Sequence, residues 1–179
     1  MITYKRLESQ DINRSLFDGF IRTQEVTRCW RKESGQWVIR ENPFVDDWGE
    51  PEYKELVRCL RNTAETGGLV MGAFFDQRLA GFVSVEKSLF GSRNQYMDLS
   101  SIHVSRDMRG HGIGKKMFSM AVDFVRENGG EKLYISGHSA VETQAFYRSL
   151  GCKEAKEYNL EHVKREPFDC QLEYDVFVR

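Results

Sequence analysis

The chain has 179 residues, of which 30% are charged, and its net charge is −1 at pH 7 with a pI near 6.4. This length predicts one domain, and the balanced charge lacks the surplus of Lys and Arg that binding to a nucleic-acid backbone requires. The four cysteines follow no metal-ligand or disulfide spacing, and no apolar run is long enough to cross a membrane or to form a signal peptide. We therefore expect a cytoplasmic protein that forms a single domain over residues 1–179 and holds no metal.

The first half of the chain is predicted to contain one strand and two helices. Residues 2–7 are predicted to form the strand, and apolar residues at helical spacing predict a helix from Asp11 onward. The apolar face of that helix consists of Leu16, Phe17, Phe20 and Ile21. Residues 22–47 have mixed periodicity and give no clear prediction, whereas Pro51 marks the first turn of the second helix, where Pro is well tolerated.

The second half predicts more strands. In chain order they cover residues 69–75, 79–85, 96–104, 132–136 and 168–177, and one more strand is expected between the last two, after the helix that Gly151 ends. The first two would pair as a hairpin about Asp76, Gln77 and Arg78. The order of elements is β, α, α, β, β, β, α, β, α, β, β, which predicts an α/β fold with one mixed sheet and helices on both of its faces.

The run from Arg109 to Gly114 joins a predicted strand to a predicted helix. One face of that helix is apolar, and its members are Ile113, Met117, Met120, Ala121 and Phe124. Gly129 and Gly130 then end the helix. A glycine-rich turn between a strand and a helix directs several backbone N–H groups and the positive end of the helix dipole at one point. Because glycines leave that point open to phosphate oxygens, the run predicts a site for a phosphorylated cofactor.

Two common phosphate-binding turns do not fit this run. A P-loop needs one more residue between its glycines and a hydroxyl residue after its lysine, but Lys115 is followed by Lys116, so the magnesium ligand would be missing. A dinucleotide-binding turn needs a third glycine where Lys115 stands. It also needs an acidic residue after the next strand, which here ends in Gly137 and His138. A nucleotide-binding oxidoreductase is therefore a distant alternative.

A third pattern, Arg-x-x-Gly-x-Gly, is met by Arg109, Gly112 and Gly114. It resembles the acyl-CoA pyrophosphate loop of the GNAT N-acetyltransferase superfamily. A second stretch, in which Tyr147 precedes Gly151, is similar to the helix that carries the last motif of that family. One helix and one strand separate the two motifs, as in the family, and the similarity covers roughly residues 69–158. The resemblance implies a GNAT-like fold whose mixed, mostly antiparallel sheet is splayed at the cofactor site.

The resemblance also implies acetyl-CoA as the co-substrate and assigns residues to its binding. The pyrophosphate would be held by the backbone N–H groups of the turn and by the charge of its first residue, the turn being Arg109, Gly110, His111, Gly112, Ile113 and Gly114. The strand residues Ile102, His103 and Val104 would part from the neighbouring strand and pair with the pantetheine amides, one freed N–H facing the thioester carbonyl. Relatives usually carry Asn seven residues before the Tyr. This chain has Ala140 there, beside Ser139, so Ser139 is the candidate for a pantetheine contact that is itself in doubt.

The resemblance places the catalytic roles on Tyr147, Asp98 and Ser100. Tyr147 would protonate the departing thiolate, since a phenol is protonated at pH 7, unless its ring only packs in the core. Ser100 stands where many relatives carry a Glu base, and Asp98 lies two residues earlier, on the same face by strand alternation. Asp98 would take the proton through water or hold the substrate ammonium, unless it is only a surface carboxylate. His103 is expected on the opposite face.

The leading hypothesis is acetyl transfer from acetyl-CoA to a primary amine of a small molecule, by direct attack in a ternary complex. Candidates for the wall around the amine are the aromatic and charged residues Glu25, Arg28, Trp30, Trp37, Phe44 and Trp48. Two alternatives stay open: a peptide or protein N-acetyltransferase, and a non-catalytic acyl-CoA-binding module, which Ser100 at the usual Glu position would suit. No nucleic acid or membrane is expected as a partner, and the resemblance leaves a homodimer open.

Overall fold

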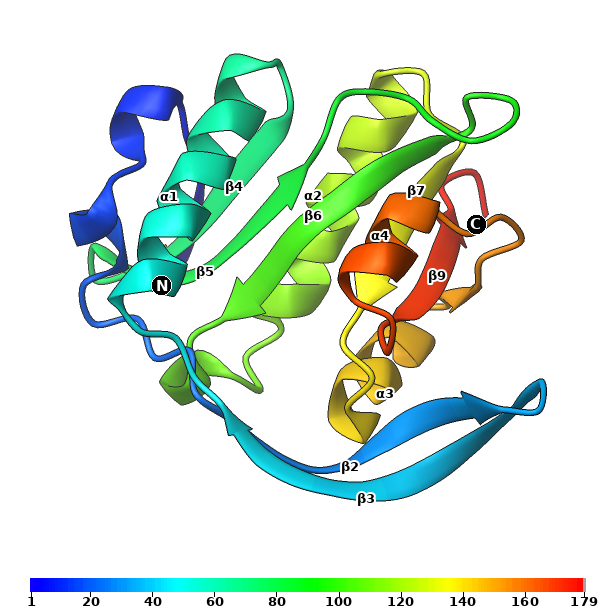
Figure 1. Cartoon of the computed structure of the whole chain (residues 1–179). Coiled ribbons are helices and arrows are strands. Elements are labelled where there is room, and N and C mark those ends of the chain that lie inside the picture. The colour runs from blue at the N-terminus through cyan, green and yellow to red at the C-terminus, as the bar shows by residue number, and fades with distance from the viewer. Residues whose placement is uncertain (179) are drawn as a thin grey trace.

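The structure, a computed structural model, describes residues 1–178 and contains a seven-stranded sheet and a separate two-stranded hairpin (Figure 1). The sheet consists, in spatial order, of β1 (Ile2–Arg6), β4 (Leu69–Phe75), β5 (Arg78–Val85), β6 (Tyr96–Val104), β7 (Lys132–Gly137), β9 (Cys170–Asp175) and β8 (Lys153–Glu154). Every neighbouring pair is antiparallel except β6 and β7, which are parallel. The mixed, mostly antiparallel sheet expected from the sequence is confirmed.

Helices cover both faces of this sheet (Figure 1). They are α1 (Glu50–Glu65), α2 (Ile113–Glu127), α3 (Val141–Ser149) and α4 (Leu160–Arg165). Helices α1 and α4 lie on one face, and α2 lies on the other. Phe17, Tyr53 and Phe82 belong to the core under α1, whereas Met117 of α2 and Tyr147 of α3 belong to the core on the opposite face. Helices α1, α2 and α3 thus bury residues against the rest of the fold, whereas α4 has no buried residue.

A long hairpin crosses the edge of the sheet at which β6 and β7 end (Figure 1). Its strands are β2 (Gln24–Glu33) and β3 (Gln36–Asp46). The Trp30 N–H donates to the Ser139 carbonyl over 2.8 Å, and Cys29 faces Ala140 in an isolated bridge, so β2 is joined to the segment that follows β7. The hairpin therefore closes one side of the space between the ends of β6 and β7.

Strand β6 leaves β7 before either strand ends. The parallel pairing runs from Tyr96 opposite Lys132 to Leu99 opposite Ile135, whereas β6 stays paired with β5 as far as Val104. The sheet is therefore splayed at residues 102–104, as the resemblance implies. Ser100 is an extra residue in β6, because Leu99 faces Val85 and Ser101 faces Ser84. Such a β-bulge bends a strand and increases its twist.

The bulge corrects the expected orientation of His103. Strict alternation would place His103 and Asp98 on opposite faces, but the extra residue shifts the alternation by one position. The His103 ring lies 4.8 Å from the Trp48 ring and 5.3 Å from the Phe82 ring, on the α1 face. Asp98 contacts His162 of α4, which lies on the same face. The prediction for His103 was wrong because a bulge is not visible in the sequence.

The N-terminal region differs most from the prediction. The helix expected from Asp11 is replaced by two 3₁₀ turns, Ser9–Asp11 and Arg14–Phe17, in which Asn13 caps the second through the Leu16 N–H. Phe17 and Phe20 are buried as expected, but Ile21 is exposed. Residues 22–47, which gave no clear prediction, contain the whole β2–β3 hairpin. Helix α4 was not expected.

Candidate active site

The turn before α2 presents backbone N–H groups at the start of a helix. Gly112 immediately precedes α2 with a φ of +77°, and Gly110 has a φ of +81°, both in the left-handed region that glycine favours. A Cβ at either position would meet no atom within 4 Å, so the turn is open on that side. No side chain among residues 1–178 caps this helix. Its first N–H groups are therefore available to an anion.

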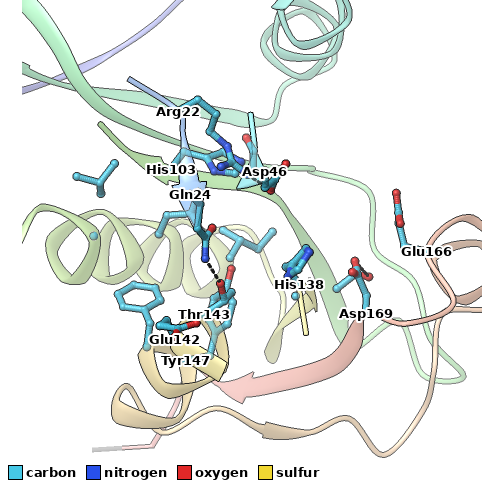
Figure 2. Close-up of a pocket in the computed structure, with 18 of the residues that line it drawn as sticks. Arg22, Gln24, Asp46, His103, His138, Glu142, Thr143, Tyr147, Glu166 and Asp169 are labelled. Atoms are coloured by element: carbon cyan, nitrogen blue, oxygen red, sulfur yellow. Dashed lines mark hydrogen bonds and ion pairs between the residues drawn. The ribbon is translucent and has the colours of Figure 1, made fainter. Parts of the chain in front are cut away.

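A cleft of about 750 Å³ opens at the splayed ends of β6 and β7 (Figure 2). Several residues singled out in the sequence line it, namely Ser100, Ile102, His103, Val104, Arg109, Gly114 and Tyr147. The others are not part of the lining, namely Asp98, Gly110, His111, Gly112, Ile113 and Ser139. The structure thus brings the splayed strand segment, one side of the turn and Tyr147 to a single cleft.

Two arginines line one end of the cleft, and one of them, Arg22, is paired with Asp46, which also lines it. The Arg22 side chain is only 10% exposed, lies 2.9 Å from the Asp46 carboxylate and stacks 4.5 Å above the Trp48 ring, while its buried Nε has no hydrogen-bond partner within residues 1–178. Arg109 also lines the cleft, and its guanidinium reaches the Thr23 carbonyl over 3.4 Å. Burial, together with the charges of Arg22 and Arg109, lowers the pKa of His103 to about 3, so this imidazole is neutral.

Helix α3 places Tyr147 against the end of β7. A Cβ on Gly137 would lie 3.0 Å from the Tyr147 ring, so glycine allows this close approach. The Tyr147 hydroxyl makes no hydrogen bond within the described residues, although it lines the cleft. Burial raises the pKa of Tyr147, which keeps the hydroxyl protonated at neutral pH. Its neighbour Phe146 packs on α2, since a Cβ on Gly114 would lie 3.2 Å from the Phe146 ring.

Asp98 is engaged by a residue far along the chain. Its Oδ2 lies 2.9 Å from Nε2 of His162, and the His162 ring stacks on the Tyr134 ring at 5.9 Å. The hydrogen bond to the Asp98 carboxylate raises the pKa of His162, because it stabilises the protonated imidazole. The other oxygen, Oδ1, is buried without a hydrogen-bond partner inside residues 1–178. The role of Asp98 as base stays a prediction, which its place outside the cleft lining does not favour.

Ser100 and Ser139 have different surroundings. Ser100 lines the cleft, and its hydroxyl lies 2.8 Å from the hydroxyl of Ser84 on β5. Ser139 is buried under β2, where its hydroxyl accepts from Arg31 over 2.8 Å and its carbonyl accepts from Trp30. A pantetheine contact of Ser139 stays a prediction, and the cover by β2 counts against it.

The end of the cleft away from Arg22 carries two carboxylates and a histidine that the sequence did not single out. Asp169 and Glu166 come from the segment between α4 and β9, and His138 follows β7 (Figure 2). The Ala140 N–H donates to Nδ1 of His138 over 3.0 Å, which leaves Nε2 as the protonated nitrogen of the neutral ring. Burial raises the pKa of Asp169. No sequence motif marks these residues, because the fold joins them from distant segments.

The expected aromatic wall is only partly present at this cleft. Phe44 lines it and lies 5.6 Å from the His138 ring. Trp48 contacts the cleft residues Arg22 and His103, and Trp37 lines a neighbouring cavity instead. Hairpin residues therefore border two adjacent cavities.

Within residues 1–178, no three or more His, Cys, Asp or Glu side chains are grouped so that they could hold a metal ion. None of the helices in the same range is long and apolar enough to span a membrane.

Comparison with protein families matches residues 26–152 to the acetyltransferase (GNAT) family. No curated protein matches the sequence. Among solved structures, nourseothricin acetyltransferase has a TM-score of 0.70 at 16% identity over 98% of both chains. A Bacillus anthracis protein assigned as a streptothricin acetyltransferase, in complex with acetyl coenzyme A, has a TM-score of 0.69 at 16% identity, covering 97% of this chain and 96% of its own.

An aminoglycoside 6′-N-acetyltransferase in complex with coenzyme A is also similar. Its TM-score is 0.56 at 15% identity, covering 74% of this chain and 83% of its own. At such identities the likeness to solved structures concerns the fold.

The Asp98–His162 pair predicts a pH dependence of stability. Because the pKa of His162 is raised in the folded state, the pair stabilises the fold fully below the unfolded pKa of about 6.5 and loses this effect as the pH rises through the folded value. We expect Asp98→Asn to lower the free energy of unfolding by about 1–2 kcal/mol at pH 6. At pH 9 the variant should equal or exceed the wild type, since the buried carboxylate then lacks a charged partner.

Urea unfolding at the two pH values measures this difference. Asp123→Asn is the matched control, because Asp123 pairs with Arg126 at 2.9 Å on an exposed part of α2 and should change stability little at either pH. A loss of stability in Asp98→Asn that is the same at pH 6 and pH 9 would contradict the pairing.

Proposed function

This chain belongs to the acetyltransferase (GNAT) family, and from that premise we propose that it transfers the acetyl group of acetyl-CoA to a primary amine of a small molecule. The observation that carries the proposal is the course of β6, whose end parts from β7 and runs along a cleft between the turn before α2 and Tyr147. The names of the structural neighbours, which include aminoglycoside and nourseothricin acetyltransferases, support a small molecule as acceptor. A cytoplasmic location stays a prediction from the sequence.

In this proposal the arginine-lined end of the cleft holds the phosphates of acetyl-CoA. The N–H groups of residues 110–114 face the pyrophosphate, and Arg109 adds a charge beside them. The pantetheine arm then follows the unpaired side of β6, where Ile102 and Val104 line the cleft. An extended arm with amide groups can pair there as a further strand would.

The reaction is a direct attack of the amine on the thioester. The nitrogen lone pair forms a bond to the acetyl carbon, the carbonyl oxygen gains negative charge near a free N–H of β6, and the carbon–sulfur bond then breaks with its electron pair on sulfur. Tyr147 protonates the sulfur, because its hydroxyl faces the cleft and stays protonated. One proton of the nitrogen replaces the proton that Tyr147 has given.

Acceptor and activity can be tested together with a panel of amines. We expect the protein to release CoA thiol from acetyl-CoA with at least one of spermidine, benzylamine, tyramine, lysine and kanamycin, followed with a thiol-reactive dye. Initial-velocity plots for that amine should intersect, as a ternary complex requires. Binding of acetyl-CoA without thiol release from any amine would identify a non-catalytic binding module, and release only with a lysine-containing peptide would identify a peptide acetyltransferase.

The role of Tyr147 predicts a loss of rate without a loss of stability. Tyr147→Phe keeps the ring in its place and removes only the hydroxyl, so kcat should fall by about 100-fold or more, as for removal of a general acid. The KM for acetyl-CoA and the melting temperature should change little. Tyr174→Phe is the control, since Tyr174 packs on Phe118 and is not among the residues lining the cleft. A Tyr147→Phe enzyme with full kcat would leave this residue with a packing role alone.

The turn predicts a specific loss of acetyl-CoA binding. Gly112→Ala and Gly129→Ala place a Cβ at positive φ, +77° and +86°, with no atom within 4 Å in either case. Both should therefore lose about 1–2 kcal/mol of stability. Only Gly112→Ala should also weaken acetyl-CoA by 10-fold or more in calorimetry, since its methyl group stands between the amides and the phosphates. Equal affinities in the two variants would contradict a pyrophosphate site at this turn.

A further inference from the structure

Asp169 stands between two cavities. It lines the cleft described above and also a second cavity of about 660 Å³, bordered by the β2–β3 hairpin and by Pro167 and Phe168. Within the part of the chain that the structure describes, it is the one residue that lines both. Figure 2 shows Asp169 beyond His138, at the end opposite Arg22.

A chain of buried hydrogen bonds ends on one oxygen of Asp169. The Asn159 N–H donates to the Tyr134 hydroxyl over 2.8 Å, and this hydroxyl donates to Oε1 of Gln171. The amide of Gln171 donates to Ser136 over 3.1 Å, and the Ser136 hydroxyl donates to Oδ2 of Asp169 over 3.0 Å. Tyr134 and Gln171 are almost fully buried. Buried polar groups are costly unless each is paired, so this chain fixes both the direction of its bonds and the place of the carboxylate.

This series of hydrogen bonds leaves Oδ1 of Asp169 available to a ligand. No hydrogen bond within residues 1–178 uses this oxygen, and it is not among the fully buried unpaired atoms. Asp98 differs in both respects. Its Oδ2 is taken by His162, and its Oδ1 is sealed in the protein. Of the two aspartates, Asp169 is the one that an incoming cation can reach.

We infer that Asp169 binds the ammonium group of the acceptor and takes its proton, and that Ser136 and Gln171 are positioning residues for this carboxylate. The inference rests on the proposed acetyl transfer and names a base for it. An alkylammonium has a pKa near 10.4, so recovering the free amine at pH 7 costs roughly 4.6 kcal/mol. A carboxylate beside the nitrogen both attracts the cation and accepts the proton.

The surroundings of Asp169 suit a base. Burial raises the pKa of its carboxyl group, and the nearby charge of Glu166 raises it further. The Ser136 hydroxyl and the imidazoles of His138 and His162 act in the opposite direction. Tyr147 on α3 and Cys170 also feel the charge of Asp169. A carboxylate with a raised pKa binds a proton more readily than an ordinary aspartate does.

The proton balance is complete without a further reactant. One proton moves from the ammonium to Oδ1 of Asp169 and from there to solvent, which frees the nitrogen lone pair for the attack. The second proton leaves the nitrogen after the new bond to carbon has formed and restores Tyr147. The products are the amide, CoA thiol and one proton released to water.

The test compares wild type with Asp169→Asn, using the amine of the panel that the wild type acetylates fastest, from pH 6 to pH 10. We expect kcat/KM for the amine to fall by about 100-fold or more at pH 7 and to recover toward the wild type at pH 10, where the free amine is abundant. The KM for acetyl-CoA and the melting temperature should stay close to the wild type, because Asn keeps the shape of the side chain and can still bond to Ser136.

Two further carboxylate variants serve as controls. Glu166→Gln removes the like charge beside Asp169, so it should lower the pH at which the wild-type kcat/KM falls on the acidic side. In Asp98→Asn, kcat/KM should fall at the same acidic pH as in the wild type, since the Asp98 carboxylate contacts His162. If the acidic fall in kcat/KM disappears in Asp98→Asn instead, Asp98 is the base and the inference is overturned.

The remaining outcomes are distinguishable. If no amine of the panel releases CoA from the wild type, the proposed function fails, and the inference fails with it. If an amine is acetylated and Asp169→Asn keeps the wild-type profile, only the inference is overturned. An equal loss at every pH would also overturn it, because a purely structural role of Asp169 would not depend on the ionisation of the amine.

Discussion

The candidate site depends on one constraint in the sheet, which is that β6 stays paired with β5 to its end while it leaves β7 halfway. The bulge at Ser100 lies directly after Leu99, the last residue paired with β7. Because a bulge adds twist to its strand, it turns the end of β6 away from β7 and opens the cleft there. The same extra residue brings His103 to the face of the sheet that carries Trp48 and Phe82. One inserted residue therefore affects both where the cleft opens and which side chains line it.

The cleft has opposite charges at its two ends. Arg22, paired with Asp46, lies at one end together with Arg109, and Asp169 and Glu166 lie at the other end, away from Arg22 (Figure 2). His103 stays neutral beside the arginines and adds no third charge. Such a separation favours a pair of ligands of which one is anionic and the other cationic. Acetyl-CoA and an alkylammonium are a pair of that kind, which is the electrostatic reason for the proposed function.

Much of the fold could be predicted from the sequence, because contiguous patterns encode it. The hairpin of β4 and β5, the strand β6 and the helix α2 follow from local periodicity and turn residues, and the splay follows from the family resemblance. The elements that the sequence did not give are short or half-exposed. The 3₁₀ turns before residue 18 carry a helix-like apolar spacing but are held by Asn13 and by packing under α1, and α4 has only six residues and no buried side chain.

The candidate site divides in the same way. The turn before α2 depends on glycines at positive φ within a few residues of one another, and such local backbone geometry is visible as a motif. The acidic end depends on contacts between distant segments. Ser136 at the end of β7 bonds to the Asp169 carboxylate, and Gln171 on β9 links Ser136 to Tyr134. These contacts exist only after the sheet has formed. Likewise, His162, which contacts Asp98, belongs to α4, a helix that the sequence pattern did not predict. Sequence patterns therefore indicate where the shared co-substrate would lie, whereas the groups proposed to face the acceptor come from the tertiary structure.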